Sequence, residues 1–261
     1  MTFATGMKSK FWEYSYDAED PNFPEIPKIT PGESQPDSER VSSFVYPGGI
    51  LAVHSQGRGK EAIWRALKNK NVYGTSGPRI LLWFDLINSP KGKIPMGSEI
   101  IMSQNPRFAI KAAGSFKQKE GCSNESIDSL SDERLDYLCA GECYNPSNER
   151  NVIERIEVIK ITPQIYSGEA ISPLIQDPWL TLPCQETGEC AVEFMDQNFS
   201  RDSVYYVRVI QEATPAINGS LLSQRDEFKL CKGSFRTDLQ DNCLSMTNER
   251  AWSSPIYINK P

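Results

Sequence analysis

Two-residue alternation of apolar and polar side chains is the feature that most constrains the fold of this chain. Tyr205, Val207 and Val209 alternate with Tyr206 and Arg208. This pattern is typical of strands that bury one face. Comparable short runs predict strands at residues 80–86, 107–113, 153–161, 190–194, 204–212 and 255–259. Because so few helices separate these runs, they predict an antiparallel β-sandwich.

A helical periodicity occurs upstream of these strands. Residues 59–70 place Ile63 and Leu67 at helical spacing, and the helix is flanked by apolar runs at 49–54 and 79–87. We therefore predict a β-α-β unit between residues 49 and 86. Such a unit cannot bury both faces of a sheet alone, so it needs neighbours that the chain does not supply.

The predicted organisation has three parts. Residues 1–43 form an extended arm, because they are interrupted by Pro21, Pro24, Pro27, Pro31 and Pro36. Residues 44–78 form the terminal β/α unit, and residues 79–261 form the sandwich with its long polar loops. Within the sandwich only residues 132–139 predict a helix, with Ser131 as its N-cap.

Charge and hydropathy exclude two classes of partner. The net charge is −6 and the sequence pI is about 5.1, and basic residues are scattered among acids. Nucleic acid is therefore not an expected partner. The sequence contains no apolar run of 18 residues and no signal peptide near Met1, so we expect neither a membrane span nor an export signal in this chain.

All seven cysteines lie in the C-terminal half: Cys122, Cys139, Cys143, Cys184, Cys190, Cys231 and Cys243. Their polar loops favour disulfides over unpaired small side chains or a zinc site. Cys184 with Cys190 would close a short loop. Cys231 with Cys243 would close a longer one, worth about 3 kcal/mol. The other three leave one thiol over. Disulfides indicate a periplasmic or secreted parent protein.

The chain has a single histidine, His54. Hydrolases with a serine or thiol nucleophile need a histidine base, and catalytic zinc sites usually use two or three histidines. The sequence therefore offers no metal ligands or catalytic residues that we can assign. The carboxylates Asp17, Glu19 and Asp20 could hold a hard cation, but solvated charges are the favoured interpretation.

Several motifs in order resemble a known family. They read GGILAVHSQGRGKEAIWRALKNKNVYGTSGPRILLWFDL, GECYNPSNER, IQDPWLTLPC, DSVYYVRVIQEATPAINGS and ERAWSSPIYI. From about Thr5 to the end, the chain resembles the C-terminal part of a bacterial domain-of-unknown-function family. That family is related to the polymerase and histidinol phosphatase (PHP) metal-dependent hydrolases. The resemblance implies a distorted β/α barrel with His-rich metal motifs and an Asp-Thr-His motif, followed by a β-sandwich.

The His-rich motifs are absent here, and the start ATGMKSKFW resembles the family's segment just after the Asp-Thr-His motif. We therefore expect that Met1 is a truncated gene start or an internal methionine. The expected fold class is α+β, mainly β: a partial β-α-β remnant of a distorted β/α barrel followed by an antiparallel β-sandwich.

The resemblance also sets the functional expectations. The full-length parent is expected to be a phosphoesterase-like hydrolase with a divalent metal (Zn, Mn or Fe) and a small anionic substrate. This chain alone is expected to be inactive, with no cofactor of its own. Its partner is the missing N-terminal barrel portion. Without it, the apolar sides of residues 49–53 and of the helix around Ile63 and Leu67 stay uncovered, which favours a homodimer.

Three residues are candidates for a position near the substrate: His54, Arg58 and Arg79. If residues 49–54 form the last barrel strand, His54 and Arg58 face the barrel mouth, where active sites of such barrels lie. The favoured alternatives are a histidine hydrogen-bonded into the barrel rim and, for Arg79, a bridge between barrel and sandwich.

A second hypothesis is a secreted β-sandwich that binds a glycan or a protein. Its binding surface would use exposed aromatic residues such as Trp179, Tyr205, Tyr206 and Trp252. For Trp179 and Trp252, a core or interface position is the favoured alternative. The predicted β-α-β unit discriminates against it, because a binding sandwich has no use for such a unit.

Overall fold

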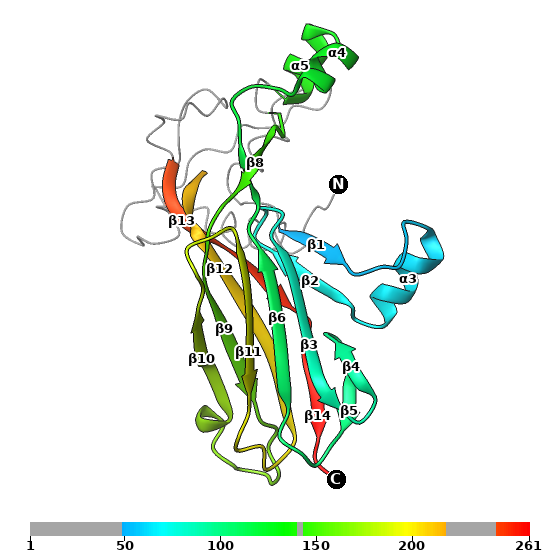
Figure 1. Ribbon diagram of the computed structural model, residues 1–261, viewed down its shortest axis with the longest axis vertical. Helices are drawn as coiled ribbons and strands as arrows, with labels where there is room; N and C mark the ends of the chain where they lie inside the picture. The colour runs from blue at the N-terminus through cyan, green and yellow to red at the C-terminus, as the bar shows by residue number, and fades with distance from the viewer. Residues whose placement is uncertain (1–48, 140–142, 218–243) are drawn as a thin grey trace, which may run out of the picture. The chain divides into compact units, whose positions relative to one another are not determined.

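The computed structural model describes residues 49–139, 143–217 and 244–261 (Figure 1). The described residues divide into two compact units. The first contains residues 49, 120–139, 143–145, 213–217 and 244–247. The second contains Ile50–Lys119, Pro146–Glu212 and Asn248–Pro261.

A larger sheet contains eight strands of the described residues. They are β1 (Ile50–Val53), β2 (Val72–Thr75), β5 (Glu99–Ile101), β9 (Ile153–Ile161), β10 (Ile175–Pro183), β12 (Ser203–Ile217), β13 (Leu244–Ser253) and β14 (Ile256–Asn259). Its order is β1-β2-β13-β12-β14-β5, with β9 pairing β12 and β10 pairing β9. The registered pairs are antiparallel except β14 with β5, which is parallel.

A smaller sheet has the order β11-β6-β3-β4 and is antiparallel. Its strands are β3 (Leu81–Ser89), β4 (Gly92–Pro95), β6 (Arg107–Ala113) and β11 (Glu189–Met195). A separate ladder joins β7 (Phe116–Gln118) to β8 (Pro146–Arg150). The described helices are α3 (Lys60–Lys68), α4 (Asn124–Ser129), α5 (Asp132–Cys139) and the short 3-10 helix η1 (Ser172–Leu174).

The core of the second unit lies between the two sheets. Phe108 on β6 is central, because its ring centroid is 5.3 Å from that of Phe84 and 4.8 Å from those of Phe194 and Tyr205. Tyr205 belongs to the larger sheet and the other rings to the smaller one. Each such buried side chain contributes roughly 1.5–3 kcal/mol by leaving water. This shared aromatic cluster therefore holds the two sheets together.

The predicted fold class, α+β and mainly β, is confirmed. Every strand predicted by alternation has a counterpart, and α3 and α5 occupy the two predicted helical segments. Ser131 accepts a hydrogen bond from the backbone N–H of Arg134 at 3.3 Å, as an N-cap does.

The connections around α3 differ from the predicted β-α-β unit. Strand β1 pairs with β2, a strand that we did not predict, and this pairing is antiparallel. The second predicted strand is β3, which lies in the other sheet. The physical reason is a reversal after α3: Lys70 has a φ of 56°, and the N–H of Asn71 donates to Ala66 O. Strand β2 therefore runs antiparallel beside β1, whereas the predicted β-α-β unit would have led through a crossover connection to a parallel strand.

Two disulfides are present among the described residues. Cys184 and Cys190, one of the two pairs expected from sequence, are joined. Cys122 is joined to Cys143, a pairing that the sequence left open. The expected pair Cys231–Cys243 lies outside the described residues. Two disulfides are consistent with an extracellular or periplasmic location.

Other predictions also fall outside the described residues, namely the arm at 1–43 and the carboxylates Asp17, Glu19 and Asp20. The boundary between a β/α unit and a sandwich at residue 78 stays a prediction. In the part of the chain that the structure describes, no helix is both long and apolar enough to span a membrane.

Candidate functional site

His54 lies just after β1, and its ring is hydrogen-bonded to β3 of the smaller sheet. Its Nε2 donates to the carbonyl oxygen of Leu82 at 2.7 Å, because a carbonyl can only accept. Its ring centroid is 5.4 Å from that of Tyr73 and 5.8 Å from that of Trp83. Burial raises the pKa of Tyr73, which a hydrogen bond with the Leu82 backbone partly offsets. Because Nε2 of His54 is bonded to Leu82 O, this nitrogen fixes the orientation of the imidazole ring.

The two arginine candidates lie on the surface. Arg58 is exposed in the loop that leads into α3, and Arg79 is exposed immediately before the buried residue Ile80. Ser76, near Arg79 in sequence, donates a hydrogen bond to Glu249 of β13. Burial raises the pKa of Glu249, and the bond from Ser76 lowers it in part.

Five large apolar side chains are exposed on β1 and α3. They are Ile50, Leu51, Ile63, Trp64 and Leu67, and we refer to them together as the β1–α3 face. Leu51 is 55% exposed and Trp64 is 54% exposed. A hollow of about 560 Å³ lies on the helix, lined by Lys60, Glu61 and the three apolar helix residues. Ile63, Trp64 and Leu67 share this hollow, and exposed apolar patches mark interaction surfaces.

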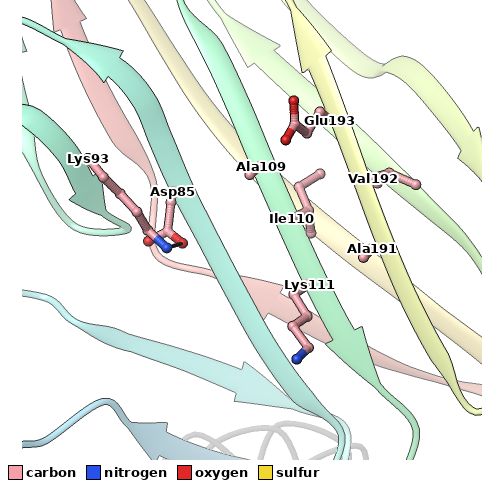
Figure 2. A pocket seen from close by; sticks show the side chains of 8 residues that line it. All are labelled: Asp85, Lys93, Ala109, Ile110, Lys111, Ala191, Val192 and Glu193. Atoms are coloured by element: carbon pink, nitrogen blue, oxygen red, sulfur yellow. Dashed lines mark ion pairs between the residues drawn. The ribbon is translucent and has the colours of Figure 1, made fainter.

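A second hollow lies on the outward face of the smaller sheet (Figure 2). We call it the outer hollow, and its volume is about 270 Å³. Its lining includes Asp85, Lys93, Ala109, Lys111, Ala191 and Glu193. Trp83 lies on the same face as Asp85, two residues away on β3, and the Nζ of Lys111 is 5.8 Å from its ring centroid.

A buried ionic cluster joins the two sheets at Asp196, which is 1% exposed. Its carboxylate accepts from Lys160 Nζ, from Tyr205 Oη at 2.5 Å and from the backbone N–H of Asn198 at 3.0 Å. Lys160 Nζ is also 5.1 Å from the ring centroid of Trp179. Burial alone would raise the pKa of Asp196, but these bonds outweigh it and hold the pKa below its ordinary value. Burial and Asp196 together raise the pKa of Tyr205.

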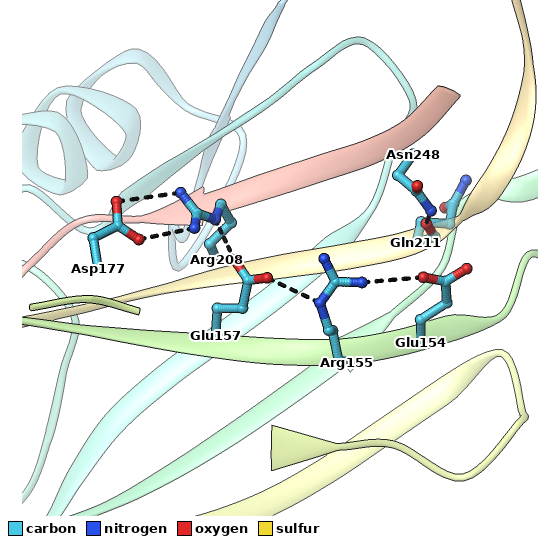
Figure 3. A network of polar contacts seen from close by, with 7 residues as sticks. All are labelled: Glu154, Arg155, Glu157, Asp177, Arg208, Gln211 and Asn248. Atoms are coloured by element: carbon cyan, nitrogen blue, oxygen red, sulfur yellow. Dashed lines mark hydrogen bonds and ion pairs between the residues drawn. The ribbon is translucent and has the colours of Figure 1, made fainter. Parts of the chain in front are cut away.

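Figure 3 shows a further ionic network, on the larger sheet. Glu157 of β9 accepts from Arg155 at 2.9 Å and from Arg208 of β12 at 2.6 Å, and Arg208 pairs with Asp177 of β10 at 2.8 Å. Arg155 also pairs with Glu154 at 3.3 Å. Burial would raise the pKa of Glu157, but the two arginines lower it overall. Because its members satisfy one another across three neighbouring strands, the network fixes the strands laterally.

The four aromatic residues considered from sequence as a binding surface are buried to different degrees. Tyr205 is fully buried, and Trp179 packs against the core. Tyr206 and Trp252 are half-buried. Among the described residues, no group of three or more His, Cys, Asp and Glu side chains is placed to hold a metal ion.

Comparison with known proteins bears on the segment that carries β1 and α3. Residues 5–119 match the model of a family described as a protein of unknown function (DUF3604). Residues 5–119 thus match a domain of unknown function. The match includes β1 to β7 and the whole β1–α3 face. No curated protein and no solved structure matches the chain.

Sequence reasoning missed the outer hollow and the Asp196 cluster. A signal for the hollow exists in LLWFDL, where Trp83 and Asp85 occupy the phase opposite to the buried Leu82 and Phe84. No local signal marks the cluster, because Lys160 and Asp196 come together only through the packing of two sheets.

Proposed function

We propose that this chain is the C-terminal part of a PHP-like metal-dependent hydrolase that acts on phosphoesters or related bonds. Two observations support the proposal: the ordered motifs that resemble that family, and the match of residues 5–119 to a domain of unknown function. In this proposal the chain supports the catalytic barrel and shapes its rim. The parent is periplasmic or secreted, in keeping with the two disulfides.

The exposed β1–α3 face is the observation that carries this proposal. It contains five large apolar side chains on the segment that the resemblance places at the end of the barrel. A protein seldom leaves several large apolar side chains of one short segment in water unless another surface covers them. The missing N-terminal barrel portion is the proposed partner, and a second copy of the chain replaces it when that portion is absent.

The divalent metal of the parent (Zn, Mn or Fe) belongs to the missing portion in this proposal, because the family's His-rich motifs precede the region of resemblance. The described residues of this chain do not fit such a metal, since they form no suitable ligand group. His54, Arg58 and Arg79 are proposed to lie near the anionic substrate. The guanidinium groups suit a phosphate, with which arginine forms paired hydrogen bonds.

Purified chain is expected to neither retain stoichiometric metal nor hydrolyse phosphoesters. A metal-bound hydroxide needs several fixed ligands and an open position, and the sequence offers one histidine. Bound Zn, Mn and Fe are measured by elemental analysis. Turnover is then measured with an aryl phosphate and an aryl phosphodiester, with each metal added in turn.

His54→Ala is the matched variant for this assay. If the chain holds one metal ion per molecule and turns over substrate, and His54→Ala abolishes both, His54 is a metal ligand and the chain is a complete enzyme. That outcome would overturn the proposal. We expect only background hydrolysis from the unmodified chain and from His54→Ala, whichever metal is added.

A further inference from the structure

The outer hollow owes its room to small side chains at the centre of a sheet face. Ala109 on β6 lies opposite Asp85 on β3 and opposite Glu193 on β11. Ala191 is the register partner of Lys111. Side chains on one face of a sheet normally fill the space above it. Here two methyl groups form a floor between longer polar side chains.

The walls of the outer hollow carry both signs of charge. Lys93 pairs with Asp85 at 2.8 Å on one side of β6 (Figure 2), and Arg107 pairs with Glu193 at 2.6 Å on the other side. An ammonium or guanidinium group has several N–H donors, and a carboxylate has several acceptor positions. Each pair therefore keeps donors and acceptors for a ligand while its net charge is close to zero.

An aromatic side chain lies on this face beside the outer hollow, outside its lining. Trp83 is 37% exposed and is the register partner of Lys111. Its ring neighbours that of His54, whose Nε2 is bonded to Leu82 O, and Lys111 Nζ lies 5.8 Å from its centroid. A large apolar ring that is held by its neighbours and remains accessible is suited to packing against the C–H face of a ligand.

We propose that the outer hollow binds a neutral saccharide. The hydroxyl groups of a sugar both donate and accept hydrogen bonds, so they suit paired acids and bases, and the C–H face of its ring suits Trp83. The volume of about 270 Å³ is just below the roughly 300–1,000 Å³ typical of pockets for drug-sized ligands, which fits one sugar ring of a longer chain.

Other ligand classes match the outer hollow less well. Lys111 adds one positive charge to the lining, but a phosphate or another anion would also meet the carboxylates of Asp85 and Glu193. An apolar peptide would remove several charged groups from water, which is costly unless they find new partners. Nucleic acid would meet a chain of net charge −6.

The test measures binding of cellohexaose, xylohexaose, mannohexaose and maltohexaose to the full chain by titration calorimetry, with oligogalacturonate as an anionic probe. At least one neutral probe is expected to bind. Trp83→Ala and, separately, Ala191→Arg are expected to weaken that binding about tenfold or more. Ala191 is exposed, so Ala191→Arg fills the hollow without disturbing the core. It keeps the test valid if Trp83→Ala fails to fold.

Tyr166→Ala is the matched control, since Tyr166 is an exposed aromatic residue outside the outer hollow and outside the β1–α3 face, and it is expected to leave saccharide binding unchanged. The proposal is overturned if no neutral probe binds or if only oligogalacturonate does. It is equally overturned if Ala191→Arg, shown by circular dichroism to be folded, binds as the unmodified chain does.

Discussion

Replacing Asp196 with alanine is expected to lower the free energy of unfolding by about 3–5 kcal/mol, the usual cost of removing one partner from a buried ion pair. The substitution leaves Lys160 largely buried without its carboxylate and leaves the hydroxyl of the fully buried Tyr205 without its acceptor. A buried polar group that loses its partner keeps its full desolvation penalty. The effect should exceed that of any exposed ion pair in the chain.

Glu193→Ala is the control for this prediction. Glu193 also pairs with a basic residue, Arg107, but both side chains are about half exposed, so the expected loss is at most about 1 kcal/mol. Both variants are compared by urea unfolding under oxidising conditions, followed by circular dichroism. Equal losses for the two variants would show that the Asp196 cluster has no special stabilising role.

The effect of Asp196 should also depend on pH in a defined direction. Its pKa is lowered in the folded protein, so the ionised carboxylate stabilises the fold above its unfolded-state pKa of about 3.9. This stabilisation is lost as the pH falls through the lower, folded-state pKa. The difference in unfolding free energy between the unmodified chain and Asp196→Asn should therefore shrink from neutral pH to strongly acidic pH.

Trp64→Ser is expected to weaken self-association of the chain about tenfold or more. Burial of one large apolar side chain is worth roughly 1.5–3 kcal/mol, and about 1.4 kcal/mol corresponds to a factor of ten in a dissociation constant. Stability of the single chain should change by no more than about 0.5 kcal/mol, because Trp64 is already half exposed.

Sedimentation equilibrium over a range of protein concentrations measures this association. Ile101→Ser is a suitable control, since Ile101 is an exposed apolar residue on β5 and does not belong to the β1–α3 face. A chain that stays monomeric at every concentration, or a Trp64→Ser variant that associates as strongly as the unmodified chain, would refute the role of this face.

The predictable part of the fold is the part with regular alternation. Val207 and Val209 are buried as their phase requires, and β9 and β12 pair as neighbours. Strand β10 was missed because Pro178 and Pro183 lie within it, and proline argues against a strand unless the strand is at an edge. It indeed pairs only with β9 among the described strands.

The candidate sites also differ in whether local sequence patterns could predict them. Ile63 and Leu67 could be identified from sequence as a helix face in need of a partner, because their spacing is local. The outer hollow could not, because its floor is assembled from β6 and β11, which are far apart in sequence. The direction of β2 also could not be predicted from the sequence, because it depends on a single turn around Lys70.

The most direct test of the central claim is the genomic DNA sequence upstream of the Met1 codon. If the chain is the C-terminal part of a PHP-like hydrolase, the same reading frame, or a neighbouring split gene, encodes an early His-x-His motif and an Asp-Thr-His motif shortly before Met1. Upstream DNA that carries a stop codon in that frame and no such motifs in any nearby reading frame would contradict the claim.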